Sequence, residues 1–503
     1  MMESMFTIQE LLDFVLLLPL AFSLLAASGF FKGGVLHWAD RLTATLVAVA
    51  VWQIVLLFPA DSSLHEGFIY LDALSLWMLL ILSLLYVAFS WTSKAYLDRD
   101  TNIRYGYLRR FTHLEGRFYA LSHLFVWTMM LVVLVDNMGL MWVAIEATTL
   151  ISALLVAFKF TRTSLEAAWK YVMVCTVGIC LALLGTILLY DAQLQVLGSE
   201  LALDFAHLAE HGKELPEGLA KVAFAFLFVG YGTKIGLAPM HAWLPDAHSE
   251  APALTSGLLS GALCICALYV LLRAVIILLP AVGVDFVQSL FLFFGLFTIA
   301  LAVPFVVVQR DIKRMLAYSS MENFGLMAAG FGLFLPLAAK AALLHMMNHA
   351  LIKYALFYLA GTIMETYATK NMMRIHGMIA QCPRTAFFFL LAIVGILGMP
   401  PMGIFFSKFY LLQGFFMGGT PWLGVLALAL LAGMLIGILY HALRMVGGKP
   451  HRKAAGELLG RLDTAVVAAL LIVSGVFGAL LPELGKFDQL LSEAARIVMK
   501  GVA

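Results

Sequence analysis

Long continuous apolar segments recur along this chain, and they constrain its fold more than any other feature. A helix needs about 20 apolar residues to cross a membrane, and on that rule the hydropathy predicts about fourteen spans. The predicted spans are 11–31, 42–59, 70–91, 118–135, 138–160, 166–190, 220–240, 253–279, 286–308, 315–335, 337–364, 385–412, 422–446 and 462–482. Because the runs are continuous rather than alternating, an outer-membrane β-barrel is excluded. The expected fold class is all-α, a polytopic membrane protein.

The composition excludes most soluble classes of protein. Of the 503 residues, 62% are hydrophobic and 12% are charged, whereas a soluble domain carries about 25% charged residues. The formal net charge is +2, so no strong field attracts nucleic acid. We therefore exclude a soluble enzyme, a disordered chain and a nucleic-acid binder, and expect the lipid bilayer as the surrounding.

Lysines and arginines are distributed unevenly between alternate loops. With the N-terminus outside, 21 of the 32 fall in inside loops, 5 in outside segments and 6 within spans. Because loops rich in lysine and arginine stay on the cytoplasmic side, both termini are expected on the outer side of the membrane. The loop 92–117 carries much of this basic charge.

Glu146, Lys170 and Lys234 are the ionisable residues in predicted spans of the first half of the chain that we interpret as functional. Glu146 and Lys234 fall near mid-membrane, and Lys170 lies nearer the inner surface. A charge at such a depth costs about 3 kcal/mol on insertion scales, so it indicates function by default. The alternative is a group that is satisfied by a buried partner and only orients helices.

The second half of the chain adds a stripe of titratable residues. His345, His349 and Lys353 follow an i, i+4, i+8 spacing, which places all three along one side of one helix. Histidine titrates near physiological pH, and burial lowers the pKa of a lysine toward that range. With Glu322 and Lys408, and with the three residues of the first half, they form the predicted proton path.

Prolines interrupt two of the predicted spans. Pro239 follows a membrane lysine by five residues, and Pro400 and Pro401 precede another. A helix breaks at such positions, and paired breaks are typical of transport sites built from repeats. We therefore expect four units: 1–117 with helices 1–3 and a basic cytoplasmic loop, 118–279 as a first proton-channel repeat (helices 4–8), 286–446 as a second (helices 9–13), and 462–503 with helix 14 and a short amphipathic tail.

The five cysteines predict no metal or cofactor site in this chain. None forms a CxxC pair or a Cys/His cluster with metal-ligand spacing. No glycine-rich dinucleotide motif follows a strand. We therefore expect no catalytic, cofactor-binding or metal-ligating residue in this chain.

Seven segments resemble the antiporter-like subunit family, which includes the proton-pumping membrane subunits of respiratory complex I, subunits of multi-subunit sodium/proton antiporters and subunits of membrane-bound hydrogenases. The chain is most similar to the F branch of hydrogenase-4-type complexes. The segments are DNMGLMWVAIEATTLISALLVAF, EAAWKYVMVC, GTKIGLAPMHAWLPDAHSEAPA, SGLLSGALCICALYVLLR, DIKRMLAYSSMENFGLMAAG, HMMNHALIKYALFYLAG and GMPPMGIFFSKF.

The resemblance implies a role for each residue of the path. Glu146 resembles the fifth-helix glutamate that pairs with the seventh-helix lysine, here Lys234. Lys170 resembles the sixth-helix lysine of the entry side, and Lys408 the twelfth-helix lysine of the exit half-channel. The histidine–lysine stripe resembles the eleventh-helix relay. One position departs from the family: where many relatives carry a lysine or histidine in the eighth helix, this chain has Ile265.

The resemblance implies a proton-translocating, non-catalytic subunit of a hydrogenase-4 or formate-hydrogenlyase type complex. Its partners would be other integral membrane subunits and a peripheral redox module, which would hold iron–sulfur clusters and a nickel–iron centre. The alternatives are a sodium/proton antiporter subunit, a complex I-type proton-pumping subunit, and the membrane subunit of an inorganic-carbon uptake complex. A fourth alternative, favoured by Ile265, is an anchor that no longer conducts.

Overall fold

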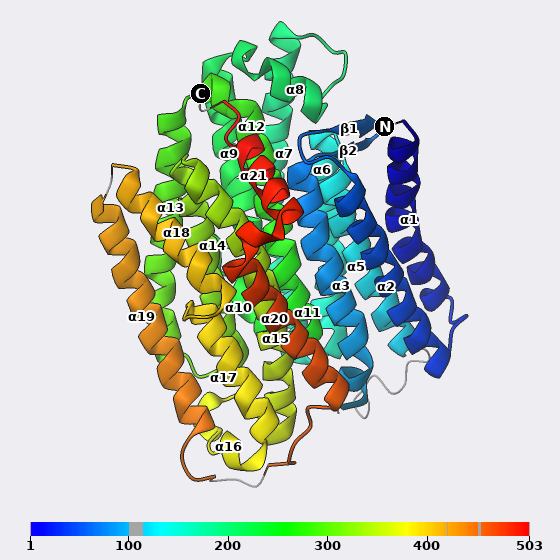
Figure 1. Ribbon diagram of the computed structural model, residues 1–503, viewed down its shortest axis with the longest axis vertical. Coiled ribbons are helices and arrows are strands. Elements are labelled where there is room, and N and C mark those ends of the chain that lie inside the picture. Colours follow the sequence, from blue (N-terminus) through cyan, green and yellow to red (C-terminus); the bar gives the residue numbers. More distant parts are fainter. Residues whose placement is uncertain (1, 100–113, 420, 451–453, 502–503) are drawn as a thin grey trace.

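The computed structural model describes residues 2–99, 114–419, 421–450 and 454–501. Most of the basic loop predicted at 92–117, and two of the basic residues counted above, Arg452 and Lys453, lie outside the described residues. Most of the described residues lie in helices (Figure 1).

The amino-terminal unit consists of three long helices and a small hairpin. The helices are α1 (Met2–Ala27), α2 (Gly34–Leu57) and α3 (Ala73–Arg99). Between α2 and α3, strands β1 (Leu64–Glu66) and β2 (Ile69–Leu71) pair antiparallel, with His65 opposite Tyr70.

The middle of the chain forms the first group of helices. They are α5 (Leu114–Leu134), α6 (Met138–Val156), α7 (Arg162–Val196), α8 (Phe205–His211), α9 (Glu217–Ile235), α10 (Leu244–Glu250), α11 (Ala253–Leu258) and α12 (Cys264–Val282). A π-helical turn, Leu259–Leu263, joins α11 to α12. Short 3-10 turns lie at Ala157–Lys159 and Gly212–Glu214.

The remaining helices form a second group and the carboxyl-terminal tail. They are α13 (Val284–Val308), α14 (Ile312–Gly332), α15 (Pro336–Tyr367), α16 (Met378–Gln381), α17 (Pro383–Leu397), α18 (Gly403–Met417), α19 (Pro421–Val446), α20 (Arg461–Ala479) and α21 (Lys486–Val498). Further 3-10 turns lie at Met372–Arg374 and Leu481–Leu484. The short amphipathic tail predicted from the sequence is α21, which packs against α3 and α15.

Eleven helices in the described part of the chain are long and apolar enough to cross a membrane. This confirms a polytopic all-α membrane protein. Three further predicted spans, 315–335, 337–364 and 385–412, coincide with α14, with α15 and with the α17–α18 pair. These helices are broken or rich in polar residues, so the count of fourteen stays a prediction.

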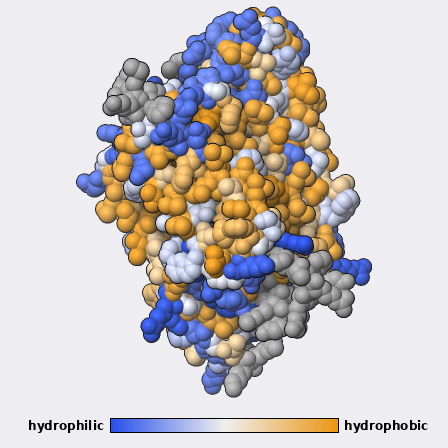
Figure 2. All heavy atoms as spheres, turned by 90° about the vertical axis from the view of Figure 1, so that its right-hand side faces the viewer, coloured by the Kyte–Doolittle hydropathy of each residue, from blue (hydrophilic) through white to orange (hydrophobic). Residues whose placement is uncertain are grey.

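The polar helices occupy the centre of the bundle. The segment 253–279 is buried throughout, whereas only about a third of the apolar window of α19 is buried. α14 and α15 pack against each other, and nearly all of their residues are shielded from the surface. The outer helices turn apolar side chains outward, and Figure 2 shows a broad apolar band across one face between two hydrophilic ends. This arrangement fits a protein whose outer surface contacts lipid and whose interior holds charge.

Both chain ends lie at the same end of the bundle, together with the β1–β2 hairpin and α8 (Figure 1). A chain that crosses the membrane an even number of times has this property. Which compartment this end faces stays a prediction from the distribution of lysine and arginine.

Candidate functional site

Lys234 lies at the first helix break. α9 ends one residue later, and Gly236 adopts a left-handed conformation (φ +90°) that a glycine tolerates at a helix end. The side chain of Lys234 is fully buried, and its Nζ donates to Thr149 Oγ1 and to Tyr171 Oη, each at 2.7 Å. The unpaired carbonyls in the last turn of a helix carry partial negative charge, which favours a cation here.

Glu146 and Lys234, predicted as a pair, do not touch in the structure. Glu146 is half-buried on α6, and its Oε2 has no hydrogen-bond partner among the described residues. Thr149 lies one turn further along α6 and, with Tyr171, takes the hydrogen bonds of Lys234. Lys234 therefore bonds neutral oxygen atoms where the family resemblance implied a direct ion pair with Glu146.

Lys170 lies on the outside of α7 rather than in the buried path. Its side chain is 50% exposed and pairs with Glu166 at 2.7 Å and with Asp246 at 3.4 Å. Successive residues of a helix point about 100° apart, so the neighbouring Tyr171 faces inward and reaches Lys234. Sequence spacing identified the right helix but not the side chain that contacts the buried lysine.

Lys408 lies just after the second helix break and forms a direct ion pair with Glu322. The two atoms, Lys408 Nζ and Glu322 Oε1, are 2.8 Å apart, and both side chains are buried. α17 ends at Leu397, so its last carbonyls lack helical partners. One of them, the carbonyl of Ile396, lies 3.4 Å from Lys408 Nζ. The break thus supplies an acceptor to the lysine that follows it.

The predicted stripe on α15 is present and fully buried. His345, His349 and Lys353 have no exposed surface. His345 bonds Ser407 through Nδ1 (2.8 Å) and Asn323 through Nε2 (2.9 Å). The ring of His349 lies 6.5 Å from that of His345, and neither of its nitrogens has a hydrogen-bond partner in the described part of the chain.

Side chains of α14 connect the two lysines of the second half. Lys353 Nζ donates to the hydroxyl of Ser319. Asn323 Nδ2 donates to the carbonyl of Ser319 (2.6 Å) and to Glu322 Oε2 (2.7 Å). These two acceptors fix the orientation of the amide, so Asn323 Oδ1 faces His345 and accepts from Nε2–H. We call Lys353, Ser319, Asn323, His345, Ser407, Glu322 and Lys408 the α14–α15 network.

Sequence analysis missed the polar residues that complete this network. Ser319 and Asn323 stand at i and i+4 beside Glu322 in AYSSMENFG, which places them on one face of a helix. That spacing is a detectable signal. Serine and asparagine do not titrate, however, so a search for ionisable residues passes over them.

No hydrogen bond in the described structure joins Lys234 to the α14–α15 network. From Lys234 the bonds run to Tyr171 and then to Ser152, at 2.7 Å. From the other side, Ser320 of α14 reaches Ser260 in the π-helical turn, also at 2.7 Å. Ile265, whose side chain cannot carry a proton, is fully buried in this central helix.

A family model described as NADH:quinone oxidoreductase/Mrp antiporter, TM, matches residues 135–435. The match covers more than half of the chain and contains every residue of the predicted path and both helix breaks. The chain belongs to this NADH:quinone oxidoreductase/Mrp antiporter family. It is an antiporter-like membrane subunit, as its sequence predicts.

Two relatives of this family member are named as hydrogenase-4 components. The chain is 35% identical over 399 residues to the hydrogenase-4 component F homolog of Methylacidiphilum infernorum, covering 79% of this chain and 82% of that protein. It is 30% identical over 359 residues to hydrogenase-4 component B of Escherichia coli, covering 69% of this chain and 50% of that protein.

Solved structures share the fold of this family member. A chain of respiratory complex I from Thermus thermophilus superposes with a TM-score of 0.83 at 21% identity, over 98% of this chain and all of that one. A chain of an archaeal membrane-bound sulfane sulfur reductase gives 0.81 at 20% identity, over 98% and 99%. A chain of the Mrp complex from a Dietzia species gives 0.81 at 19% identity, over 98% of each.

A second buried polar cluster lies outside the region that the antiporter family model matches. His123 of α5 bonds Asp40 of α2 through Nε2 (2.8 Å), and its Nδ1 lies 2.5 Å from Tyr86 Oη. Ser90 and Ser93 of α3 donate to the two oxygens of the same aspartate. Hydrophobic periodicity gives no sign of this cluster, because its members come from three helices that are distant in the sequence.

Proposed function

We propose that this chain translocates protons as the antiporter-like subunit of a redox-driven membrane complex of the hydrogenase-4 type. The observation that carries the proposal is the α14–α15 network. In it the Asn323 amide joins His345 to the Lys408–Glu322 pair, and the same amide donates to the carbonyl of Ser319, whose hydroxyl accepts from buried Lys353. Ionisable groups inside a membrane are expensive and mark ion pathways. A set of them held in one hydrogen-bonded network supports proton transfer better than an anchoring role.

Each group of the network has a task that its chemistry allows. Lys353 holds a proton and can release it to the hydroxyl of Ser319. His345 carries a proton on Nε2 and presents Nδ1 to Ser407, so its two nitrogens can take up and release protons on opposite sides of the ring. Lys408 and Glu322 form an ion pair at the helix break. When a proton neutralises Glu322, the attraction between the two side chains is lost and they can separate.

The first repeat (118–279) would supply the first half-channel, built around Lys234. Neutral oxygens of Thr149 and Tyr171 hold this lysine, so it can lose its proton without leaving a carboxylate unpaired. Glu146 stands one helical turn from Thr149 and is placed to tune that step. Between the halves, water would have to carry the proton past Ile265, from Ser152 toward Ser260.

The names of the relatives support the type of complex. The 35% identity to a hydrogenase-4 component F homolog extends over most of both chains. By this proposal, other integral membrane subunits and a peripheral redox module form the complex, and iron–sulfur clusters and a nickel–iron centre lie in those partners. The complex would lie in a prokaryotic inner membrane with both termini of this chain outside.

Metal analysis of the intact complex tests its type. The chain is tagged, the complex is extracted under mild conditions, and nickel and iron are measured in the co-purifying subunits. Nickel with iron supports the hydrogenase-4 type. Iron without nickel would favour a complex I-type assembly, and absence of both metals would favour a sodium/proton antiporter or a carbon-uptake complex.

A further inference from the structure

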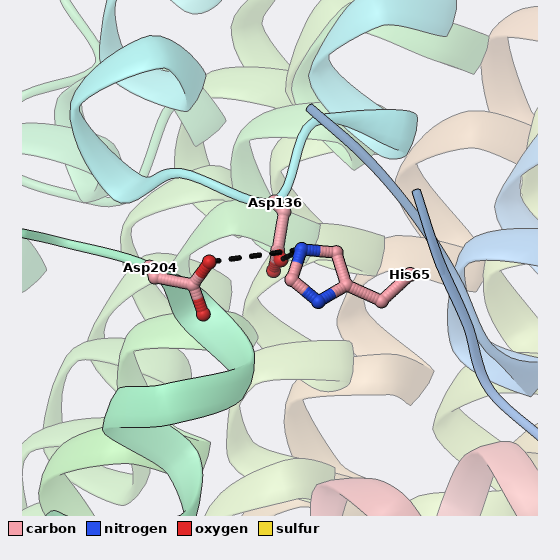
Figure 3. A group of neighbouring side chains, drawn as sticks. All are labelled: His65, Asp136 and Asp204. Atoms are coloured by element: carbon pink, nitrogen blue, oxygen red, sulfur yellow. Dashed lines mark ion pairs between the residues drawn. The ribbon is translucent and has the colours of Figure 1, made fainter. Parts of the chain in front are cut away.

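Three metal-ligating side chains from distant parts of the sequence meet at the end of the bundle that carries both termini. His65 lies on β1, Asp136 in the turn between α5 and α6, and Asp204 at the N-cap of α8 (Figure 3). His65 Nε2 is 2.6 Å from Asp136 Oδ2 and 3.7 Å from Asp204 Oδ2. One donor atom from each residue lies within 4.8 Å of the others.

Backbone groups hold both carboxylates in place. Asp136 Oδ1 accepts from the amide of Ala206 (3.3 Å), and Asp204 Oδ1 accepts from the amide of His207 (2.9 Å). The second oxygen of each carboxylate is left to face the imidazole of His65. The same segments are joined through the main chain, because the amide of Phe205 donates to the carbonyl of Asp136 at 2.7 Å. The two carboxylates are therefore positioned before any ligand arrives.

The cluster has an excess of negative charge in a shielded place. Asp136 is 2% exposed, and its Oδ2 accepts no hydrogen bond in the described structure, although His65 Nε2 lies near it. The free oxygens of Asp136 and Asp204 both approach His65 Nε2, so the two carboxylates lie close enough to repel each other. A cation between the carboxylates would remove this repulsion.

We propose that His65, Asp136 and Asp204 bind one divalent transition-metal ion of the Zn²⁺ class. One imidazole nitrogen and two carboxylate oxygens are donors that Zn²⁺ accepts, and water can complete a tetrahedral site. His65 is 43% exposed and gives the ion a route from solvent. Mg²⁺ and Ca²⁺ prefer oxygen ligands throughout, so the imidazole disfavours them.

Such an ion would join the β1–β2 hairpin to the start of α6 and the start of α8. This role is separate from the proposed proton path, which uses none of the three residues. Sequence spacing could not reveal the site, because its ligands lie 71 and 68 residues apart. The expectation that this chain holds no metal rested on local spacing alone.

Zn²⁺ binding to the full-length chain in detergent micelles tests the proposal. The protein is stripped of metal with a chelator and titrated with Zn²⁺ against a chromogenic zinc indicator at pH 7.5. We expect one Zn²⁺ per chain, and at least a tenfold weaker affinity in His65→Gln and in Asp136→Asn. Because His65 is on an exposed hairpin, His65→Gln should keep the metal-free melting temperature of the wild type.

A pair of histidines on α8 provides the matched control. His207 and His211 lie one turn apart on α8, with ring centroids 4.6 Å apart, and are the competing explanation for Zn²⁺ binding that the test must exclude. His211→Gln should leave the Zn²⁺ affinity unchanged. The proposal fails if wild type binds no stoichiometric Zn²⁺, if His65→Gln binds as tightly as wild type, or if His211→Gln abolishes binding.

Discussion

Lys408 Nζ lies 2.8 Å from Glu322 Oε1, and this buried ion pair joins the second helix break to α14. In the proposed repeats, Lys234 and Glu146 hold the equivalent positions, yet Lys234 bonds only neutral oxygens. The two halves of the chain therefore hold their lysines by different means. A lysine without a carboxylate partner releases its proton more readily than one in an ion pair.

Glu322→Gln should weaken both stability and proton transport. Removing one partner of a buried ion pair leaves an uncompensated charge and costs about 3–5 kcal/mol. The control is Asp488→Asn, which removes the more exposed Lys340–Asp488 pair (2.6 Å) and should cost about 1 kcal/mol or less. Thermal unfolding of the two purified variants checks the difference; equal losses would show that Lys408 is not compensated by Glu322.

Ser319→Ala should slow proton transport more than it affects folding. The variant removes the hydroxyl that accepts from Lys353, a hydrogen bond to a charged group worth about 1.5–3 kcal/mol. Ser83→Ala is the matched control, because Ser83 is also buried but bonds only the carbonyl of Leu80. Proton uptake by vesicles that contain the complex is the measurement. Indistinguishable rates for the two variants would remove Ser319 from the path.

Lys234→Ala and Lys170→Ala should behave differently although both lysines lie in predicted spans. Lys234 is fully buried, and its loss should abolish proton transport through the first half-channel. Lys170 is half exposed and pairs on the surface of α7, so its loss should leave transport within about twofold of wild type. Transport assays on the two assembled complexes decide this. Loss of transport in Lys170→Ala alone would support the entry role that the family resemblance implies.

Asp40→Ala should destabilise the amino-terminal helices. The fraction of the variant that folds correctly should transport protons at the wild-type rate. The variant leaves His123, Ser90 and Ser93 without their shared acceptor in a buried site, at a cost of about 1–3 kcal/mol for each unsatisfied group. We expect a lower melting temperature and a normal proton-to-turnover ratio. A normal melting temperature with a reduced ratio would assign the cluster to the proton path.

Much of the fold could be predicted from the sequence, because apolar length and proline position act locally. Helix ends at Ile235 and Leu397 follow from the glycines and prolines after them. The i, i+4, i+8 spacing on α15 likewise identified a fully buried stripe. These features need no knowledge of neighbouring helices.

The errors concern which side chain faces which neighbour. Hydropathy cannot tell the outward Lys170 from the inward Tyr171, because that depends on how α7 packs on α9. Nor can it show that Thr149, rather than Glu146, meets Lys234. The clusters around His123 and His65 form only when helices and turns far apart in the sequence come together.

The central claim is tested most directly by the number of protons that the assembled complex moves per electron transferred. This ratio is measured in sealed vesicles for Lys353→Ala and for wild type. Lys353 is fully buried and begins the α14–α15 network. If protons pass through this network, the variant should assemble with its normal metal content but no longer transport protons. In wild type, a protonophore should abolish the same proton signal. An unchanged ratio in the assembled variant would contradict the account.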